Sequence, residues 1–220
     1  MARSLPYRVY LPPCYETGGQ GSYPVLLLIH GLQSSDSQWD ELGIDETADE
    51  MIRAGDLAPV VIVMPWERKG LDFETSIIDV LLPHIRSVYA GDGSRAATAI
   101  GGLSRGAGWA LRIGLKHPEA FGSIGLHSPA VLPPDMFFIE EWVQAGEADH
   151  GPPRLWIDIA ERDTSRLGAL ELAALLDELG LTYAWSTAPG EHTPAYWSSR
   201  LSDYLGWYGR PWREPAMLSP

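Results

Sequence analysis

The chain has 220 residues, of which 45% are hydrophobic and 20% are charged, and this length and balance are typical of one soluble globular domain. The formal net charge of −13 argues against binding of nucleic acid or of an anionic membrane, because both need a basic surface that neutralises phosphates. The single cysteine, Cys14, excludes an internal disulfide, and no cluster of Cys and His lies near it to form a structural metal site.

No signal peptide is visible in residues 1–6, which favours a cytoplasmic location, or a secreted one if a leader has been removed. The longest apolar stretch, residues 25–29, is too short to cross a bilayer, so no contact with a membrane is expected.

The predicted elements alternate between strands and helices along the chain. Residues 7–11 alternate in polarity and are closed by two prolines, which predicts an edge strand. Buried strands are predicted at 25–29, 59–64, 96–100, 121–127, 154–159 and 181–186. Helices are predicted at 45–54, 73–89 with a bend at Pro83, 109–117, 167–179 and 193–207.

The remaining segments are weakly patterned. Loops are expected at 18–22 and 32–39, a helix with a loop at 133–151, and an extended tail at 210–220. Strands that alternate with helices predict an α/β fold in which helices flank a mainly parallel central sheet, as a single domain over residues 1–220.

One pentapeptide, Gly102-Leu103-Ser104-Arg105-Gly106, fits the pattern G-x-S-x-G between a buried strand and a helix. This is the pattern of a nucleophile elbow, a strained turn whose small flanking residues let strand and helix approach closely. Ser104 is therefore predicted to project its hydroxyl from the carboxyl edge of the sheet as a nucleophile.

A serine hydroxyl needs a base within hydrogen-bond reach and a carboxylate that orients the base. In α/β-hydrolases the order along the chain is Ser, acid, His. His127, His150 and His192 lie beyond the elbow, and only His192 follows the last predicted strand by a short loop. His192 is predicted to be the base, and the alternative is a helix cap or a surface residue.

Three carboxylates cluster around the end of the strand at 154–159. Asp158 falls inside the strand, whereas Asp163 lies in the loop that should face the site, so Asp163 is predicted to be the acid. Glu161 remains an alternative acid, and the alternative role of Asp163 is to cap the following helix.

The oxyanion of the tetrahedral intermediate needs two backbone N–H donors. One is expected from Arg105, directly after the nucleophile, and the other from Leu32, in the His30-Gly31-Leu32 loop after the strand at 25–29. The alternative for His30-Gly31 is a turn that only ends a strand.

Large aromatic residues are numerous, with nine Trp and nine Tyr, so some are expected to line a cleft. Trp39 and Trp66 follow predicted strands, and His127 ends one, so these three residues are candidates for contact with substrate. Packing in the core is the alternative for both tryptophans. No metal or organic cofactor is expected.

With these features the chain resembles the "Putative esterase" family of α/β-hydrolases, which includes feruloyl and acetyl-xylan esterases, S-formylglutathione hydrolases, enterochelin-type esterases and mycolyltransferases. The resemblance lies in the segments 10–13, 23–31, 95–106 and 117–123 and in Gly190, His192 and Trp197. The chain departs from the family at Arg105-Gly106-Ala107, where Met-Gly-Gly is common, and only residues 130–153 leave room for a lid.

The resemblance implies a serine carboxylesterase that hydrolyses short-acyl or aryl esters of the acetyl or feruloyl type, with a small-molecule or carbohydrate ester as its substrate. Two alternatives remain open, an acyltransferase that uses the same triad and a catalytically silent protein that binds carbohydrate or another partner. The sequence leaves the oligomeric state open.

Overall fold

The structure is a computed structural model that describes residues 5–13, 15, 22–147 and 150–213. Cys14, most of the loop expected at 18–22, and residues 214–220 lie outside the described residues. No helix in the described part of the chain is long and apolar enough to span a membrane.

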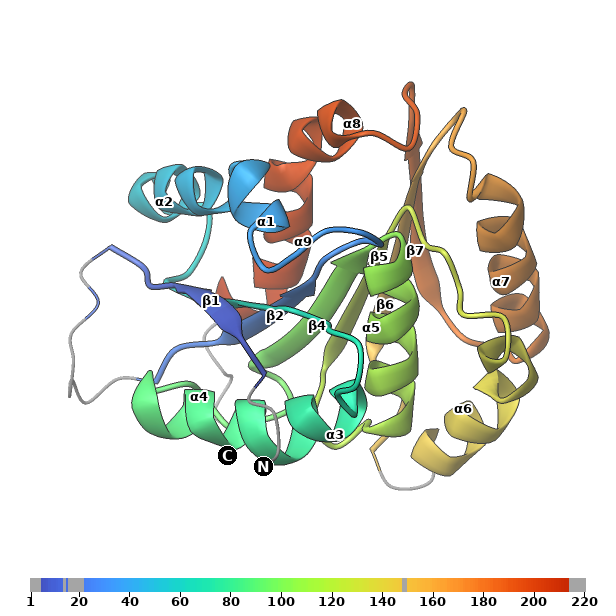
Figure 1. The fold of residues 1–220 in the computed structure, drawn as a ribbon, viewed down its shortest axis with the longest axis horizontal. Coiled ribbons are helices and arrows are strands. Elements are labelled where there is room, and N and C mark those ends of the chain that lie inside the picture. The colour runs from blue at the N-terminus through green and yellow to red at the C-terminus, as the bar shows by residue number, and fades with distance from the viewer. Residues whose placement is uncertain (1–4, 14, 16–21, 148–149, 214–220) are drawn as a thin grey trace.

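Seven strands form one sheet in the order β1-β3-β2-β4-β5-β6-β7 (Figure 1). The edge strand β1 runs antiparallel to β3, and all other pairs are parallel, which confirms the predicted mainly parallel α/β sheet. The strands are β1 Tyr7–Tyr10, β2 Val25–Ile29, β3 Val61–Pro65, β4 Thr98–Leu103, β5 Ser123–His127, β6 Arg154–Ala160 and β7 Tyr183–Ala188.

Helices cover both faces of this sheet (Figure 1). They are α1 Gln38–Glu41, α2 Ile44–Ala54, α3 Phe73–Thr75, the π-helical η1 Ser76–Leu81, α4 Leu82–Val88, α5 Arg105–Lys116, the 3₁₀ helix η2 Asp135–Phe137, α6 Ile139–Glu147, α7 Arg166–Glu178, α8 Pro194–Ser199 and α9 Leu201–Arg213. The short α1 lies within the segment that was expected to be a loop, because a single turn is too short to show helical periodicity.

The central strands are buried on both faces, so alternate residues enter two separate cores. In β2, Leu27 belongs to the core on the side of α4, α5 and α7, whereas Leu26 and Leu28 belong to the core on the side of α2, α8 and α9. The continuous apolar run at 25–29 therefore reflects a strand between two layers of helices.

The helix predicted at 73–89 with a bend at Pro83 is divided into α3, η1 and α4. Because Pro83 has no N–H to donate to the carbonyl of Asp79, the α-helical ladder cannot continue through it. The preceding residues, Ser76–Leu81, form a π-helical turn, and Pro83 occupies the first turn of α4, where it is tolerated.

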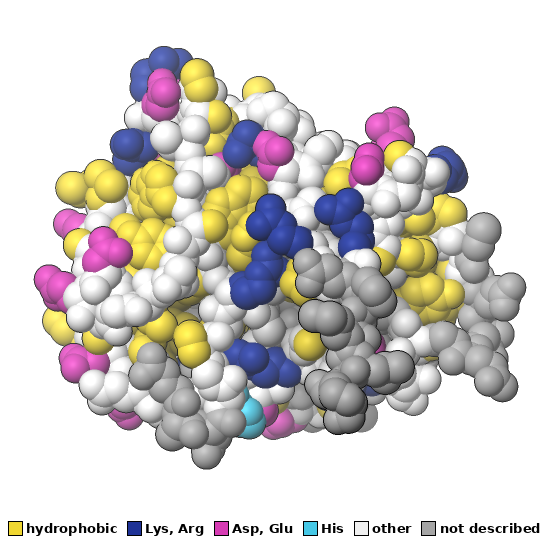
Figure 2. Space-filling model, turned by 180° about the vertical axis from the view of Figure 1, so that it is seen from behind, with side chains coloured by type: hydrophobic (Ala, Val, Ile, Leu, Met, Phe, Trp, Pro, Cys, Tyr) yellow, Lys and Arg dark blue, Asp and Glu magenta, His cyan; other side chains and the backbone are white. Residues whose placement is uncertain are grey.

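The extended tail predicted from Arg210 is wrong as far as Arg213, because α9 continues through Pro211. In an α-helix, residue 211 would donate to the carbonyl of Trp207, and the guanidinium of Arg154 donates to that carbonyl instead, at 3.1 Å. Arg154 also lies 4.5 Å over the Trp207 ring. On the face of the molecule opposite to that in Figure 1, several Lys and Arg side chains lie close together (Figure 2).

The segment between β5 and β6 begins beside Ser104, where the Ala130 N–H donates to the Ser104 carbonyl at 3.0 Å, and then continues to the other end of α5. Its helix α6 packs against the distal end of α5, where Gly146 contacts Pro118. In the described part of the segment, α6 therefore does not cover the serine, in agreement with the prediction of little or no lid.

Candidate active site

Ser104 occupies the turn between β4 and α5 with φ 54° and ψ −117°. A positive φ is unfavourable for a residue with a side chain, and the surrounding glycines allow it by close packing. A Cβ on Gly102 would lie 2.3 Å from the carbonyl of Gly106, and a Cβ on Gly106 would lie 2.3 Å from the carbonyl oxygen of Ile29. The turn therefore has the geometry predicted for a nucleophile elbow.

The three predicted triad residues meet at the carboxyl ends of their strands. The Nε2 atom of His192 lies 3.0 Å from Ser104 Oγ, and its Nδ1 atom lies 2.9 Å from Asp163 Oδ1. When Nδ1 carries the proton and donates it to Asp163, Nε2 is free to accept the proton of the serine hydroxyl. This is the hydrogen-bonded arrangement that activates a serine.

Asp163 is held as a carboxylate by its donors. Its buried Oδ1 also accepts the backbone N–H of Ser165 at 2.7 Å. Burial alone would raise the pKa of Asp163, but the hydrogen bonds from His192 and the Ser165 amide hold it below its usual range. An ionised acid next to His192 stabilises the imidazolium that forms when the histidine takes a proton.

The other two carboxylates near this strand have different surroundings. Asp158 is fully buried and accepts hydrogen bonds from Ser186, Tyr204 and Arg200. Glu161 is exposed, and its backbone N–H donates to Ala188. The structure places only Asp163 in contact with His192.

Two residues to which the sequence assigned no role in the site, Trp197 and Ser128, lie behind the triad. The indole N–H of Trp197 donates to Ser128 Oγ at 2.9 Å, and the Trp197 ring stands nearly perpendicular to His192 at 5.0 Å. Ser128 has a positive φ of 51°, a strained conformation in which its buried hydroxyl accepts the Trp197 N–H. A serine after a strand carries no sequence signal of this role.

The loop after β2 lies beside the serine, since a Cβ on Gly31 would lie 3.7 Å from Ser104 Cβ. The Gly31 N–H donates to Gln38 Oε1 at 2.7 Å, which anchors the loop. Neither the Leu32 nor the Arg105 amide donates to an acceptor among the described residues. Both amides are therefore available for an oxyanion, as the prediction requires.

Two of the three candidate substrate contacts are wrong. Trp39 is 1% exposed, and its indole N–H donates to the carbonyl of Ile29. His127 is fully buried against Tyr204 and Tyr208, and burial lowers its pKa to about 3, so it remains neutral. Both side chains pack in the core behind the site. Trp66 is half-buried after β3, with Arg68 4.7 Å over its ring, and stays a prediction.

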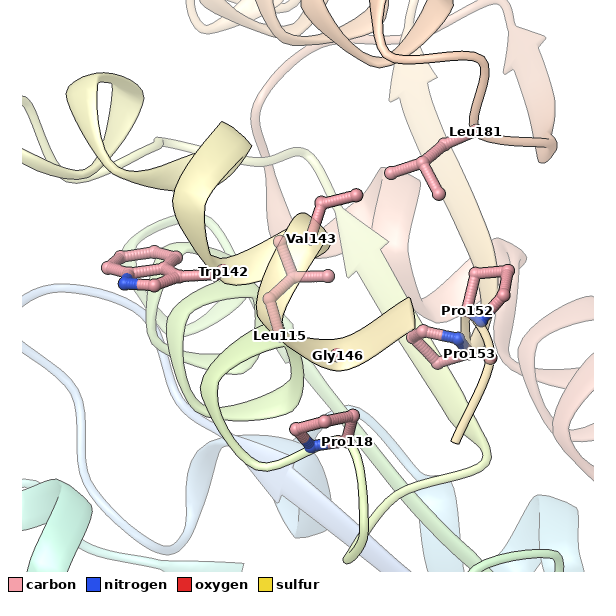
Figure 3. A pocket seen from close by; sticks show the side chains of 9 residues that line it. Leu115, Pro118, Trp142, Val143, Gly146, Pro152, Pro153 and Leu181 are labelled. Carbon is pink, nitrogen blue, oxygen red and sulfur yellow. The ribbon is translucent and has the colours of Figure 1, made fainter. Parts of the chain in front are cut away.

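A small apolar pocket lies away from the triad (Figure 3). Leu115, which lines it, is ten residues beyond Arg105 along α5, or about 15 Å at the usual rise of a helix. Within the ranges that the structure describes, no three His, Cys, Asp or Glu side chains gather as metal ligands.

The parallel sheet, the strained serine and its hydrogen-bonded histidine and carboxylate are the architecture of α/β-hydrolases. The family model described as "Putative esterase" matches residues 1–208, and the chain belongs to this esterase family.

Two curated relatives are longer than this chain. An endo-1,4-beta-xylanase/feruloyl esterase of Xylanibacter ruminicola is 31% identical over 143 residues, which cover 58% of this chain and 20% of that protein. An uncharacterized protein of Corynebacterium glutamicum is 25% identical over an alignment of 240 positions, which covers 91% of this chain and 56% of that protein. The chain thus spans about half, or less, of the length of these relatives.

Three solved structures share the fold. A ferulic acid esterase has a TM-score of 0.82 at 24% identity and covers 93% of this chain and 91% of its own. The feruloyl esterase module of Clostridium thermocellum, complexed with sinapinate, has a TM-score of 0.80 at 16% identity, with 97% and 86% covered. The S-formylglutathione hydrolase of Staphylococcus aureus has a TM-score of 0.77 at 17% identity, with 93% and 92% covered.

Proposed function

We propose that this protein is a serine carboxylesterase that hydrolyses short-acyl or aryl esters through an acyl-enzyme. The observation that carries the proposal is the continuous hydrogen-bonded line from Ser104 through His192 to Asp163. The unpaired amides of Leu32 and Arg105 beside the serine give the same proposal a second support.

The proposed reaction has two halves. Ser104 Oγ attacks the ester carbonyl while His192 Nε2 takes its proton, and the Leu32 and Arg105 amides bind the oxyanion. His192 then protonates the leaving alcohol, which departs and leaves an acyl group on Ser104. Water, deprotonated by the same histidine, attacks the acyl-enzyme, the bond between the acyl carbon and Ser104 Oγ breaks as His192 returns the proton to Oγ, and the acid is released, while Asp163 stabilises the imidazolium in both halves.

The proposed substrate class rests on the surroundings of the serine. In the described part of the chain, α6 packs at the distal end of α5 and Ser104 is partly exposed, which supports access of a short-acyl or aryl ester without the opening of a lid. The structural neighbour from Clostridium thermocellum carries sinapinate, an aromatic acid. Acetyl and feruloyl esters are the proposed range, with a small-molecule or carbohydrate alcohol.

The test is steady-state hydrolysis of p-nitrophenyl acetate, p-nitrophenyl butyrate, methyl ferulate and S-formylglutathione. Turnover of an acetyl or feruloyl ester by the wild type is expected, with kcat lower by about 10⁴-fold or more in Ser104→Ala. Ser202→Ala, at an exposed position of α9, is the matched control and should retain full activity. Equal activity in Ser104→Ala and the control would refute the proposal.

Hydrolase and transferase are separated by product analysis with an added alcohol or sugar acceptor. Release of free acid as the main product at low acceptor concentration is expected. Transfer that outcompetes water under those conditions would instead identify an acyltransferase that uses the same three residues.

A further inference from the structure

The side chain of Arg105 has a partner that its sequence position does not explain. Its guanidinium donates to Glu67 Oε1 at 3.0 Å, with the Arg105 side chain 35% exposed and that of Glu67 16% exposed. Among the residues that the structure describes, this is the hydrogen bond that the guanidinium makes. Arg105 therefore carries a proposed oxyanion donor on its backbone and an ion pair on its side chain.

Glu67 reaches the opposite side of the proposed oxyanion hole through its backbone. It follows β3, and its N–H donates to His30 Nε2 at 3.0 Å. The other ring nitrogen of His30 donates to the carbonyl of Gly31 at 2.7 Å. Since Gly31 precedes Leu32, this chain of hydrogen bonds ends at the peptide that carries the second oxyanion donor.

The tautomer of His30 is determined by these two contacts, because Nδ1 must donate to a carbonyl and Nε2 must accept from an amide. Burial lowers the pKa of His30, which keeps the ring neutral and able to accept. A protonated ring would place two N–H donors face to face at Glu67.

The two sides of the hole are also in contact through their backbones. A Cβ on Gly106 would lie 2.5 Å from the carbonyl oxygen of His30, so the start of α5 abuts the end of β2. The Arg105–Glu67 ion pair joins the same two segments indirectly, because the N–H of Glu67, after β3, donates to the His30 ring. An oxyanion hole stabilises the charge best when both donors are fixed before the charge develops. Two sets of contacts that hold the start of α5 against the end of β2 therefore have a direct catalytic use.

We propose that Arg105, Glu67 and His30, called the clamp from here on, join the two sides of the oxyanion hole, and that Glu67 and the guanidinium of Arg105 are positioning residues for ester hydrolysis. This inference rests on the proposed esterase function. The clamp holds the Leu32 amide at the distance from the Arg105 amide that a tetrahedral intermediate needs.

The test is a double-mutant cycle on kcat with Arg105→Met, Glu67→Gln and the double variant, all of which keep the backbone amides. Each single variant is expected to lower kcat about 10-fold with little change in KM, which is less than the loss of one whole oxyanion donor, about 10²–10³-fold. The double variant should lose no more than either single variant, because the two side chains act as one unit. Arg105→Lys, which keeps a cationic donor, should recover part of the loss.

Phenylboronic acid gives a readout that a merely structural role would not move. It forms a tetrahedral adduct with a nucleophilic serine, so its Ki should rise by the same factor by which kcat falls. Arg53→Met, which removes the exposed ion pair with Asp49 on α2, is the matched control and should change neither quantity.

Any of the following outcomes would contradict the proposed role of the clamp. Unchanged kcat and Ki with a lower melting temperature would make the contact purely structural, and additive losses would make the two residues independent. A rise in KM confined to esters that carry a carboxylate would make the guanidinium a substrate ligand. These outcomes leave the proposed function intact, whereas a wild type that neither hydrolyses esters nor binds the boronic acid overturns both.

Discussion

Gly106→Ala is predicted to damage both stability and activity, although alanine is the better helix former. The new Cβ would lie 2.3 Å from the carbonyl oxygen of Ile29 and 2.5 Å from that of His30, and backbone oxygens cannot rotate away as a flexible side chain can. Overpacking of this kind costs about 3 kcal/mol, at the upper end of the usual range. The higher helix propensity of alanine offsets about 1 kcal/mol, which leaves a net loss of about 2 kcal/mol.

The matched control is Gly206→Ala in the interior of α9, where the nearest atom to a new Cβ is Met51 Cε at an ordinary 3.9 Å. This variant should gain about 1 kcal/mol from helix propensity alone. At about 2–4 °C per kcal/mol for a chain of this size, Gly106→Ala should lower the melting temperature by about 4–8 °C and Gly206→Ala should raise it by about 2–4 °C. Thermal unfolding followed by circular dichroism measures both.

Activity separates this prediction from simple destabilisation. The two oxygens belong to the end of β2 and the start of the oxyanion loop, so relief of the overlap moves the Leu32 amide away from Ser104. Displacement of one oxyanion donor lowers kcat by about 10²–10³-fold, measured well below the melting temperature. A Gly106→Ala protein that is as stable as Gly206→Ala and hydrolyses p-nitrophenyl acetate at the wild-type rate would refute the packing of the elbow described above.

Further predictions concern the triad and its response to pH. His192→Ala and Asp163→Asn should each lower kcat by about 10³-fold or more. Asp158→Asn should keep activity but lose stability, about 1–3 kcal/mol, because Tyr204 and Arg200 lose a buried carboxylate acceptor while Arg200 keeps its ion pair with Asp203. Loss of activity in Asp158→Asn, with Asp163→Asn active, would transfer the acid role to Asp158. The depressed pKa of Asp163 contributes stability that is present above its unfolded value, about 3.9, and is lost as pH falls through the folded pKa. As the pH is lowered below about 4, the free energy of unfolding, measured by urea titration, should therefore fall less in Asp163→Asn than in the wild type. An identical fall in both proteins would contradict the lowered pKa of Asp163.

Local patterns predicted the parts of the fold that depend on local chemistry. The apolar run at 25–29 and the alternation at 7–11 correctly indicated a doubly buried strand and an edge strand. The predicted end of an element was wrong where a contact with a residue distant in sequence determines it. α9 continues through Pro211 because Arg154, more than fifty positions away, takes the carbonyl of Trp207 that the proline cannot use.

The residues of the site also include some that the sequence predicted and some that it did not. Ser104, Asp163 and His192 were predictable because strands of a parallel sheet end at one edge, so residues directly after those ends converge. Ser128 was not predictable, since its role depends on a strained backbone and on contact with Trp197, which no local pattern reports. His127 misled because the end of a strand can face either the cleft or the core.

The proposed chemistry depends most on Ser104 as an activated nucleophile. Folded protein treated with a fluorophosphonate and analysed by intact-mass spectrometry tests this directly. The wild type is predicted to gain one adduct, located at Ser104 by peptide mapping, and Ser104→Ala and His192→Ala are predicted to gain none at the same exposure. A folded wild type that stays unlabelled, or an adduct that persists in Ser104→Ala, would contradict the central claim.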